Sequence, residues 1–452
     1  MGFEKKVELV GITRHPDDDS WRPDDYVVAP AMGCKSELSS SVIHGKYAVN
    51  GEPYGEKELN WNQTQDIIIQ GTVGSGHGAV LDMLDFHFSI DNLTRASTLF
   101  LCGPEYASHL QQSLRAVSAE RGFDSFSEEF GGERGFDFIV PEKNEGNDIM
   151  GEQFELYEKM CDAGVITEDA RIILPLNTKT AIHSKWDARE LAHLKSMSER
   201  MDVPSDVRDI VSQMYDLAYK VAPKSMANWG KNFEVLSWFP SSQLFSRGNS
   251  VLEGLANEDK GMQLLGYHIG LEMTADEISK AIKNRDEALL SNLKHYHFTF
   301  SIPMSLMSFH QATRQRTWNQ AVEPLSSAVK RGEYTLPETI KKAGFGKDFV
   351  SLFEKSVNYV RENLDNPNIY GVVPHALEVY NVVHINGWNA IHSIGKRTCT
   401  HAQWEIRNLA RYMAGKIEEV TPELGKYAAP QGITYGVCPE KKPCGLCKTN
   451  NG

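Results

Sequence analysis

The sequence predicts an α+β protein made of two tandem repeats, each a β-sheet packed with long helices. β-rich runs such as HFTFSI (297–302) and QDIIIQGTV (65–73) alternate with long amphipathic stretches, for example around 152–164 and 205–222. The two halves of the chain also resemble each other. With 452 residues, 41% of them apolar and 24% charged, the chain is large enough for two or three globular cores.

The internal repeat is recognised from residue pairs that recur at nearly constant spacing. In the early part of the repeats, Phe86, Phe88 and Ile90 align with Phe298, Phe300 and Ile302. Later pairs align at an offset of 199 residues: Pro175 with Pro374, His193 with His392 and Arg208 with Arg407. Because the early offset is near 211, the first repeat carries about a dozen extra residues, which we assign to the loop at 122–138.

These pairs predict four regions. An N-terminal extension (1–40) precedes a first repeat (41–245), a second repeat (246–425) and a cysteine-containing tail (426–452). Within the second repeat, HSIGKRTCTHAQWEIRNLARYM (392–413) is expected to form one long amphipathic helix.

Charge and composition exclude several classes of protein. A net charge of -13 argues against binding to nucleic-acid backbones. No apolar run approaches the ~20 residues that cross a bilayer, and residues 1–15 lack the apolar core of a secretory signal. Seven cysteines without such a signal favour reduced thiols and a cytoplasmic setting. We therefore expect no nucleic-acid or membrane partner.

The second repeat contains closely spaced cationic and aromatic residues. Arg397 is followed by His401 and the run Ala402-Gln403-Trp404-Glu405-Ile406-Arg407, and Arg314-Gln315-Arg316 follows a Phe-x-Phe strand. This pattern resembles the signature of flavin-dependent thymidylate synthases. The resemblance covers most of residues 70–425, and neither repeat is complete.

Each repeat keeps the motifs that the other has lost. The first keeps the phosphate loop Gln111–Arg115 and the Ala-Arg-x-x-Leu-Pro motif around Arg171, but has Gly103-Pro104-Glu105 for Arg-His-Arg and Ser198 for the later arginine. The second has Tyr370 where Arg171 stands, and Pro324 and Ser326 in its phosphate loop. It retains His295, Gln311, Arg314, Gln315, Arg316, Asn386, His392, Arg397 and His401.

The resemblance implies an enzyme that methylates dUMP at carbon 5 to dTMP, with FAD as cofactor and NADPH and methylene-tetrahydrofolate as cosubstrates. It implies a composite site between the repeats and a homodimer that reproduces a tetramer of single repeats. Arg397 and Arg314 would be catalytic, and the substrate would contact Gln311, Ser113, Arg115 and Arg171. FAD would contact Arg314, Gln315, Arg316, His295, Asn386, His392 and His401. Arginine forks suit phosphate because they bind it bidentately.

Other interpretations remain open. Gln315 in place of histidine and Trp388 in the Asn-Ala-Arg register leave room for another flavin-dependent modification, such as hydroxymethylation, of another pyrimidine nucleotide. A third interpretation is that the chain binds flavin or nucleotide without catalysing a reaction. His392 and His401 could be core histidines and Ser113 a turn residue, while Trp404 and Glu405 are predicted to be structural.

Metal binding is considered at two places. His295 and His297 share one strand face, but no third ligand lies near them in sequence, so no metal is assigned there. The tail holds Cys438, Cys444 and Cys447, which could bind zinc or an iron–sulfur cluster if a distant residue supplied a fourth ligand. The alternative is a flexible tail with reactive thiols.

Overall fold

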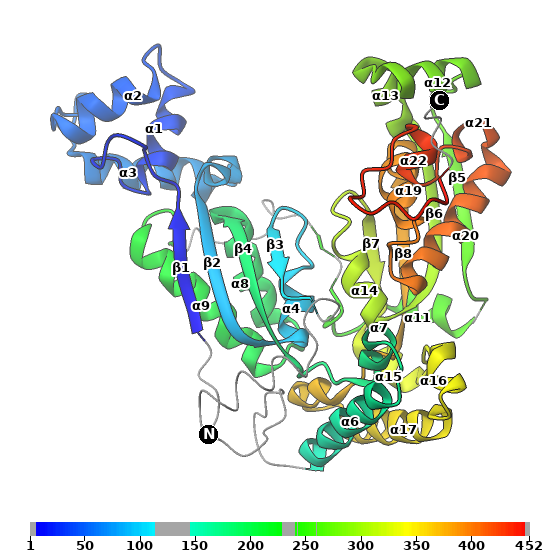
Figure 1. Ribbon diagram of the computed structural model, residues 1–452. Coiled ribbons are helices and arrows are strands. Elements are labelled where there is room, and N and C mark those ends of the chain that lie inside the picture. Colours follow the sequence, from blue (N-terminus) through cyan, green and yellow to red (C-terminus); the bar gives the residue numbers. More distant parts are fainter. Residues whose placement is uncertain (1–5, 114–144, 228–239, 242, 259, 448–452) are drawn as a thin grey trace. The chain divides into compact units, whose positions relative to one another are not determined.

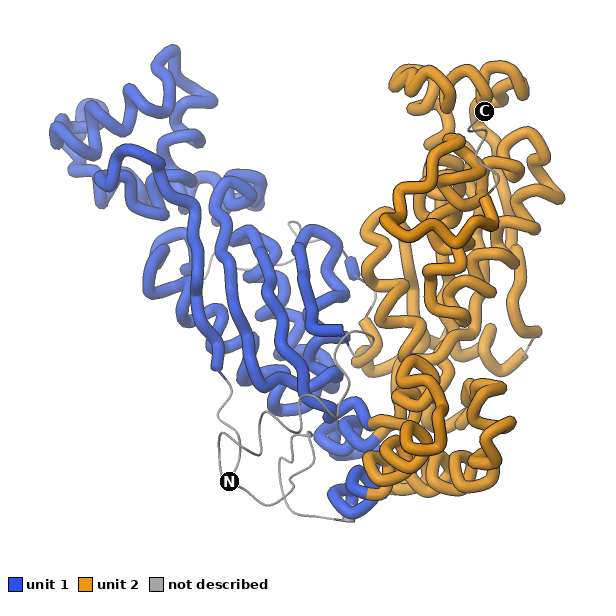
Figure 2. Tube along the Cα trace, viewed as in Figure 1, with its two compact units in different colours: residues 1–151, 175–241, 363–372 blue, residues 152–174, 242–362, 373–452 orange. Residues whose placement is uncertain are grey.

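The computed structural model describes residues 6–113, 145–227, 240–241, 243–258 and 260–447. They form two compact units, each containing a four-stranded antiparallel sheet with helices packed on it (Figures 1 and 2). Unit 1 comprises residues 1–151, 175–241 and 363–372, and unit 2 comprises 152–174, 242–362 and 373–452. The α+β prediction is confirmed.

The sheet of unit 1 has the strand order β1 (Lys6–Ile12), β2 (Asp85–Thr94), β4 (Lys179–Asp187), β3 (Ser108–Gln111). Three helices pack around this sheet: α4 (Arg95–Leu101), α8 (Ala188–Arg200) and α9 (Ser205–Val221). The remaining helical elements are α1 (Asp25–Gly33), α2 (Ser40–Ile43), η1 (His44–Val49), α3 (Trp61–Thr72), η2 (Val73–Ser75), η3 (Gly78–Met83) and η6 (Pro367–Val372).

The sheet of unit 2 has the strand order β5 (Gln263–Ile269), β6 (Tyr296–Ser305), β8 (Glu378–Asn386), β7 (Asn319–Val322). Helix α6 (Glu145–Asp162) begins in unit 1 and continues into unit 2. The other helical elements are α7 (Thr167–Ala170), η4 (Arg171–Ile173), α11 (Ser250–Asn257), α12 (Ala275–Asn284), α13 (Glu287–Asn292), η5 (Leu293–His295), α14 (Leu306–Ala312), α15 (Leu325–Arg331), α16 (Glu338–Lys342), α17 (Gly346–Glu362), α18 (Gly387–Asn389), η7 (Ala390–Ile394), α19 (Gly395–Arg397), α20 (Trp404–Val420), α21 (Pro422–Gly425) and α22 (Gln431–Thr434).

The two sheets are built in the same register. Phe88 pairs with Ser184 in β2–β4, and Phe300 pairs with Val383 in β6–β8. Phe88 and Phe300 thus occupy the same position in the register of their sheets. A bulge in β2 between Ile90 and Leu93, with Asn92 at a φ of 56°, adds one residue relative to β6. The tandem repeat is therefore present in the backbone pairing.

A segment of each repeat lies in the unit that contains most of the other repeat. Residues 152–174, which belong to the first repeat in sequence, lie in unit 2, and residues 363–372 of the second repeat lie in unit 1 (Figure 2). In unit 2 the His375 backbone N–H donates to the Leu174 carbonyl at 3.0 Å. In unit 1 the Asn177 N–H donates to the Gly371 carbonyl at 2.8 Å. Each compact unit is thus completed by the other repeat.

A buried carboxylate caps the strand–helix junction in both units. Asp206 accepts hydrogen bonds from Thr94 Oγ1 and Ser97 Oγ, each at 2.9 Å. The equivalent Glu405 accepts from the Ser305 N–H at 2.7 Å and Ser305 Oγ at 2.6 Å. Burial raises the pKa of Glu405 to about 7. These bonds satisfy backbone and hydroxyl donors that would otherwise be unpaired, so Glu405 is structural, as predicted.

Several predicted elements can be compared with the structure. The HFTFSI run lies in β6, and the stretches around 152–164 and 205–222 lie in α6 and α9, so these predictions are confirmed. The prediction for QDIIIQGTV is wrong, because this segment lies mainly in helix α3. Asn60 and Gln63 form a capping box that starts the helix. Ile67 remains 53% exposed, so the isoleucine run does not form a buried strand.

The single long helix predicted at 392–413 is also wrong. The chain forms η7 and α19, leaves the helix at Thr398–Gln403 and starts again at α20. Gln403 has a non-helical backbone, with a ψ of 141°, and its side-chain oxygen accepts from the Ile406 N–H at 3.0 Å, as an N-cap does. Arg397 therefore ends one helix instead of lying within another. The predicted insertion at 122–138 lies outside the described residues.

Candidate functional site

Arg397 is positioned against the Arg314-Gln315-Arg316 triplet. It is the last residue of α19. When the Gln315 amide is oriented with its oxygen toward Arg397, that oxygen accepts from Arg397 Nη2 at 2.8 Å and Nε at 3.1 Å. The middle residue of the triplet therefore orients the arginine predicted to be catalytic, although it is glutamine and not histidine.

The triplet itself is held by the helix that precedes Arg397. Thr317 Oγ1 donates to Asn389 Oδ1 at 2.6 Å, and Asn389 Nδ2 donates to the Thr317 carbonyl at 2.9 Å. Trp318 Nε1 donates to Ser393 Oγ at 2.7 Å. Sequence reasoning did not identify these four residues. Asn389 could have been found, since it lies three residues after the helix-capping Asn386.

This arrangement leaves donors available for an anionic ligand. Arg314 and Arg316 are exposed beyond the end of α14. On the same helix, Gln311 Nε2 is buried without a hydrogen-bond partner among the described residues. An unpaired buried amide donor is costly, so a ligand oxygen would stabilise it. These groups fit the phosphates and carbonyls of a flavin nucleotide.

The remaining predicted flavin contacts also belong to unit 2. Asn386 caps α18 by accepting from the Asn389 N–H at 2.9 Å. His392 stacks on Trp388 with centroids 5.6 Å apart, and Lys396 Nζ lies 3.3 Å from its Nε2. Burial, followed by the charge of Lys396, lowers the pKa of His392, which favours neutral imidazole. His295 and His401 are exposed.

Arg171 lies in unit 2, although it belongs to the first repeat. It is 4% exposed, and its Nε donates to the Glu168 carbonyl at 3.1 Å. Its segment is held on one side by Asp169, whose Oδ1 accepts from Trp404 Nε1 at 2.8 Å. On the other side, the Leu174 carbonyl bonds His375, whose ring stacks on His310 beside Gln311. Unit 2 thus combines Arg171 with the arginines of the second repeat.

Unit 1 carries different chemistry at the equivalent positions. Glu105 stands where unit 2 has Arg316, and Asp187 stands where it has Asn386. Burial raises the pKa of Asp187 to about 6, with smaller contributions from nearby acids that include Asp82 and Glu190. Burial followed by the charge of Glu190 also raises the pKa of Glu105. An acidic site of this kind disfavours a pyrophosphate.

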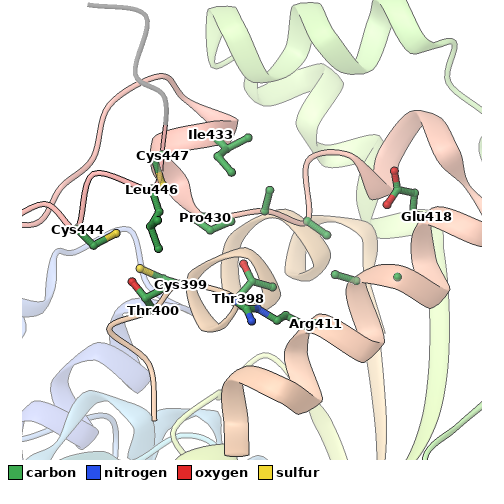
Figure 3. Close-up of a pocket in the computed structure, with 14 residues that line it drawn as sticks. Thr398, Cys399, Thr400, Arg411, Glu418, Pro430, Ile433, Cys444, Leu446 and Cys447 are labelled. Atoms are coloured by element: carbon green, nitrogen blue, oxygen red, sulfur yellow. The ribbon is translucent and has the colours of Figure 1, made fainter. Parts of the chain in front are cut away.

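The predicted phosphate loop is only partly described. Ser113 is exposed after β3 in unit 1, and Arg115 lies outside the described residues. In the described part of the chain, no group of three or more His, Cys, Asp or Glu side chains is already positioned to hold a metal ion. A pocket of about 400 Å³ lies in unit 2 beside α20 and the tail (Figure 3). None of the residues predicted to contact flavin or nucleotide lines this pocket.

Comparison with known proteins identifies the family. The family model described as "Thymidylate synthase complementing protein" matches residues 22–224 and 257–423, one segment for each repeat. The chain belongs to this family. It is 30% identical to a flavin-dependent thymidylate synthase of Sulfolobus acidocaldarius over 198 residues, which are 42% of this chain and 75% of that protein.

Two further similarities were found. A flavin-dependent thymidylate synthase of Thermococcus onnurineus is 27% identical over 190 residues, which are 40% of this chain and 71% of that protein. Among solved structures, a UMP/dUMP methylase of Streptomyces cacaoi bound with 5-Br dUMP is 18% identical, with a TM-score of 0.35, covering 49% of this chain and 93% of that one. No helix among the described residues is long and apolar enough to span a membrane.

Proposed function

We propose that the chain is a flavin-dependent enzyme that methylates dUMP at carbon 5, using methylene-tetrahydrofolate and NADPH. The main support is the location of Arg171, which comes from the first repeat but lies in the compact unit that holds Arg314 and Arg397. The family membership and the names of the related proteins agree with this proposal.

Phosphate recognition is the proposed role of Arg171, together with Ser113 and Arg115. A nucleoside monophosphate carries about two negative charges, which planar guanidinium groups bind through paired hydrogen bonds. Because Arg171 is 4% exposed, little water competes for its guanidinium. Asp169 is bonded to Trp404 and Thr339, so it holds the backbone of this segment in place.

The base and the flavin would be held by the second repeat. Gln311 and Arg397 would donate to pyrimidine carbonyls, and Arg397 would stabilise the negative charge that develops on the ring when carbon 5 attacks. Arg314 and Arg316 would bind the flavin phosphates, with His295, Gln315, Asn386, His392 and His401 as further contacts. FAD, when bound and reduced, supplies the hydride for this chemistry.

Two observations favour a second candidate, modification of a different pyrimidine nucleotide. Gln315 offers Arg397 a neutral amide in place of imidazole. Trp388, which replaces an arginine of the family pattern, stacks on His392. These changes alter the contacts around flavin and base. The alternative reaction is therefore hydroxymethylation, or another flavin-dependent modification, of a different pyrimidine nucleotide.

The deciding assay is tritium release from dUMP labelled at carbon 5, with FAD, NADPH and methylene-tetrahydrofolate supplied. The wild-type protein should release tritium, and Arg397→Ala and Arg171→Ala should each lower the rate at least about 100-fold. Arg200→Ala is the control, because Arg200 is exposed and bonds Ser196 on its own helix. Absence of release from protein that binds flavin would contradict dUMP as the substrate.

Subunit number is tested separately. We propose a homodimer. Each chain contains two fused repeats, so two chains would reproduce an assembly of four single repeats. Light scattering should give a mass near twice 50.7 kDa. A monomer at micromolar concentration would contradict this part of the proposal.

A further inference from the structure

The C-terminal tail has little core of its own. From Tyr435 to Cys447 the described chain forms no helix or strand. Val437 and Leu446 are 69% and 70% exposed. Ordering each residue costs about 1–2 kcal/mol of conformational entropy, which burial of apolar surface must offset. Since these side chains bury little surface, the tail would adopt one conformation only if another interaction stabilised it.

Four cysteines from different parts of the chain gather at this tail. Cys399, in the break between α19 and α20, lines the same pocket as Cys444 and Cys447. Figure 3 shows the side chains of Cys399 and Cys444 directed toward each other, with Cys447 nearby. The tail itself contains three cysteines. The fourth, Cys399, lies 39 residues before Cys438 in the sequence.

Cys438 lies close to Cys447, because both cysteines pack against Gly432. A Cβ atom added at Gly432 would lie 2.7 Å from Cys447 Cβ and 3.5 Å from Cys438 Cβ. Only glycine lets these two cysteines pack so closely on α22.

The Cys-Gly-Leu-Cys turn brings two cysteines to one pocket, because Cys444 and Cys447 both line it. Gly445 adopts a φ of 73°, which allows the turn. Two cysteines separated by two residues have the spacing that is typical of structural zinc sites.

We propose that Cys399, Cys438, Cys444 and Cys447 form a four-thiolate site for Zn²⁺ that fastens the tail to the loop following Arg397. All seven cysteines are free thiols, and the four are not yet arranged at metal-ligand distances. Binding therefore requires rotation of their side chains around the ion until each Zn–S distance is about 2.3 Å.

The charge of this site is partly compensated near the surface. Each thiol that binds Zn²⁺ loses one proton to solvent, so four thiolates and the ion leave a net charge of about −2. Glu440, Lys441 and Lys442 lie in the connection between Cys438 and Cys444 and are exposed. The two lysines outnumber the glutamate, so the connection offsets part of this negative charge. The proposed site is independent of the flavin chemistry, and its role is structural.

The first test uses the intact wild-type chain, purified without an affinity metal and treated with a chelator under reducing conditions. Titration with Co²⁺ should give the visible absorption of a tetrahedral cobalt–thiolate centre, saturating at one ion per chain and disappearing when Zn²⁺ is added. Absence of this spectrum would overturn the proposal. So would a disulfide among the four cysteines that forms in place of metal binding.

A second test locates the ligands without relying on variants that could unfold. N-ethylmaleimide labelling of the native protein, read by mass spectrometry, should spare the four proposed cysteines only when Zn²⁺ is present. Cys34, which is exposed, should react equally with and without the metal. Cys399→Ser should weaken Co²⁺ binding at least about 100-fold, while Cys161→Ser leaves it unchanged. Unchanged binding by Cys399→Ser would remove this residue from the site.

Discussion

Units 1 and 2 share a scaffold but differ in the residues placed on it. Both sheets have the same strand order and register, and both junctions use a buried carboxylate, Asp206 or Glu405. At the equivalent site positions, however, unit 1 has Glu105, Ser198, Asp187 and Tyr370, whereas unit 2 has Arg316, Arg397, Asn386 and Arg171. Both units keep the residues that pack the sheet and its junction, whereas at these positions the arginines lie in unit 2.

The largest expected effect is on flavin binding, when Arg316 of unit 2 is replaced by glutamate, the residue at the equivalent position of unit 1. Arg316→Glu should weaken flavin binding about 100-fold or more, because it removes a phosphate donor and adds repulsion. Flavin absorbance after gel filtration measures this directly. The reciprocal control, Glu105→Arg in unit 1, should leave binding unchanged. If Arg316→Glu retained as much flavin as the wild type, Arg316 would not be a flavin contact, and the proposed difference between the two units at this position would be wrong.

The exchanged segments provide the next comparison. Arg171→Tyr, which copies the residue of the second repeat, should lower kcat/KM for the nucleotide about 100-fold. Tyr370→Phe in unit 1 should leave kcat/KM within about twofold, since that segment is not assigned to the site. Steady-state kinetics and circular dichroism together separate loss of binding from loss of folding. A larger defect in Tyr370→Phe than in Arg171→Tyr would reverse the assignment.

The buried carboxylate of unit 2 predicts a dependence of stability on pH. The pKa of Glu405 in the folded protein is about 7, above its ordinary value of 4.5, so the folded state holds this proton more tightly. Stability is therefore lost as pH rises from about 4.5 to 7. Glu405→Gln removes this loss, and its stability relative to the wild type should increase by about 2 kcal/mol across that range. Urea denaturation at pH 5 and pH 8 measures the change, and parallel pH profiles would refute it.

The smallest predicted effect concerns Asp187. Its pKa is raised to about 6 from 3.8, so its contribution to stability falls as pH rises through this interval. Asp187→Asn copies Asn386 of unit 2 and keeps the side-chain oxygen that caps the following helix. The stability of Asp187→Asn relative to the wild type should increase by about 2 kcal/mol between pH 4 and pH 7. A constant difference at all pH values would mean that the carboxyl is not perturbed.

The sequence predicted those parts of the fold that depend on local pattern and on the repeat. The alignment of Phe88 with Phe300 agrees with the structure, where both residues occupy the same position in the register of their sheets, while the pairing of the strands was not predicted. The helix at 61–72 was missed because its isoleucine run resembles a strand, while the Asn60–Gln63 capping box determines the structure. The break at Thr398–Gln403 was missed for a similar reason, since a side-chain cap outweighs helical periodicity there.

Residues brought together by tertiary structure were harder to predict. The alignment showed that Arg171 and Tyr370 are equivalent, but not that their segments are exchanged between the compact units. The pairing of Arg397 with Gln315 depends on the contacts of Thr317 and Trp318 with the following helix, which no motif contains. Likewise, Cys399 lies far in sequence from the tail cysteines that it joins in space.

Flavin stoichiometry tests the central claim most directly. The protein, saturated with FAD and freed of excess ligand, should contain one flavin per chain, because Arg314 and Arg316 lie in unit 2 and unit 1 has Glu105 in place of Arg316. Arg314→Ala should remove most of this flavin, and Glu105→Gln should leave it in place. Two flavins per chain, or loss of the bound flavin in Glu105→Gln but not in Arg314→Ala, would contradict the assignment of the flavin contacts to unit 2.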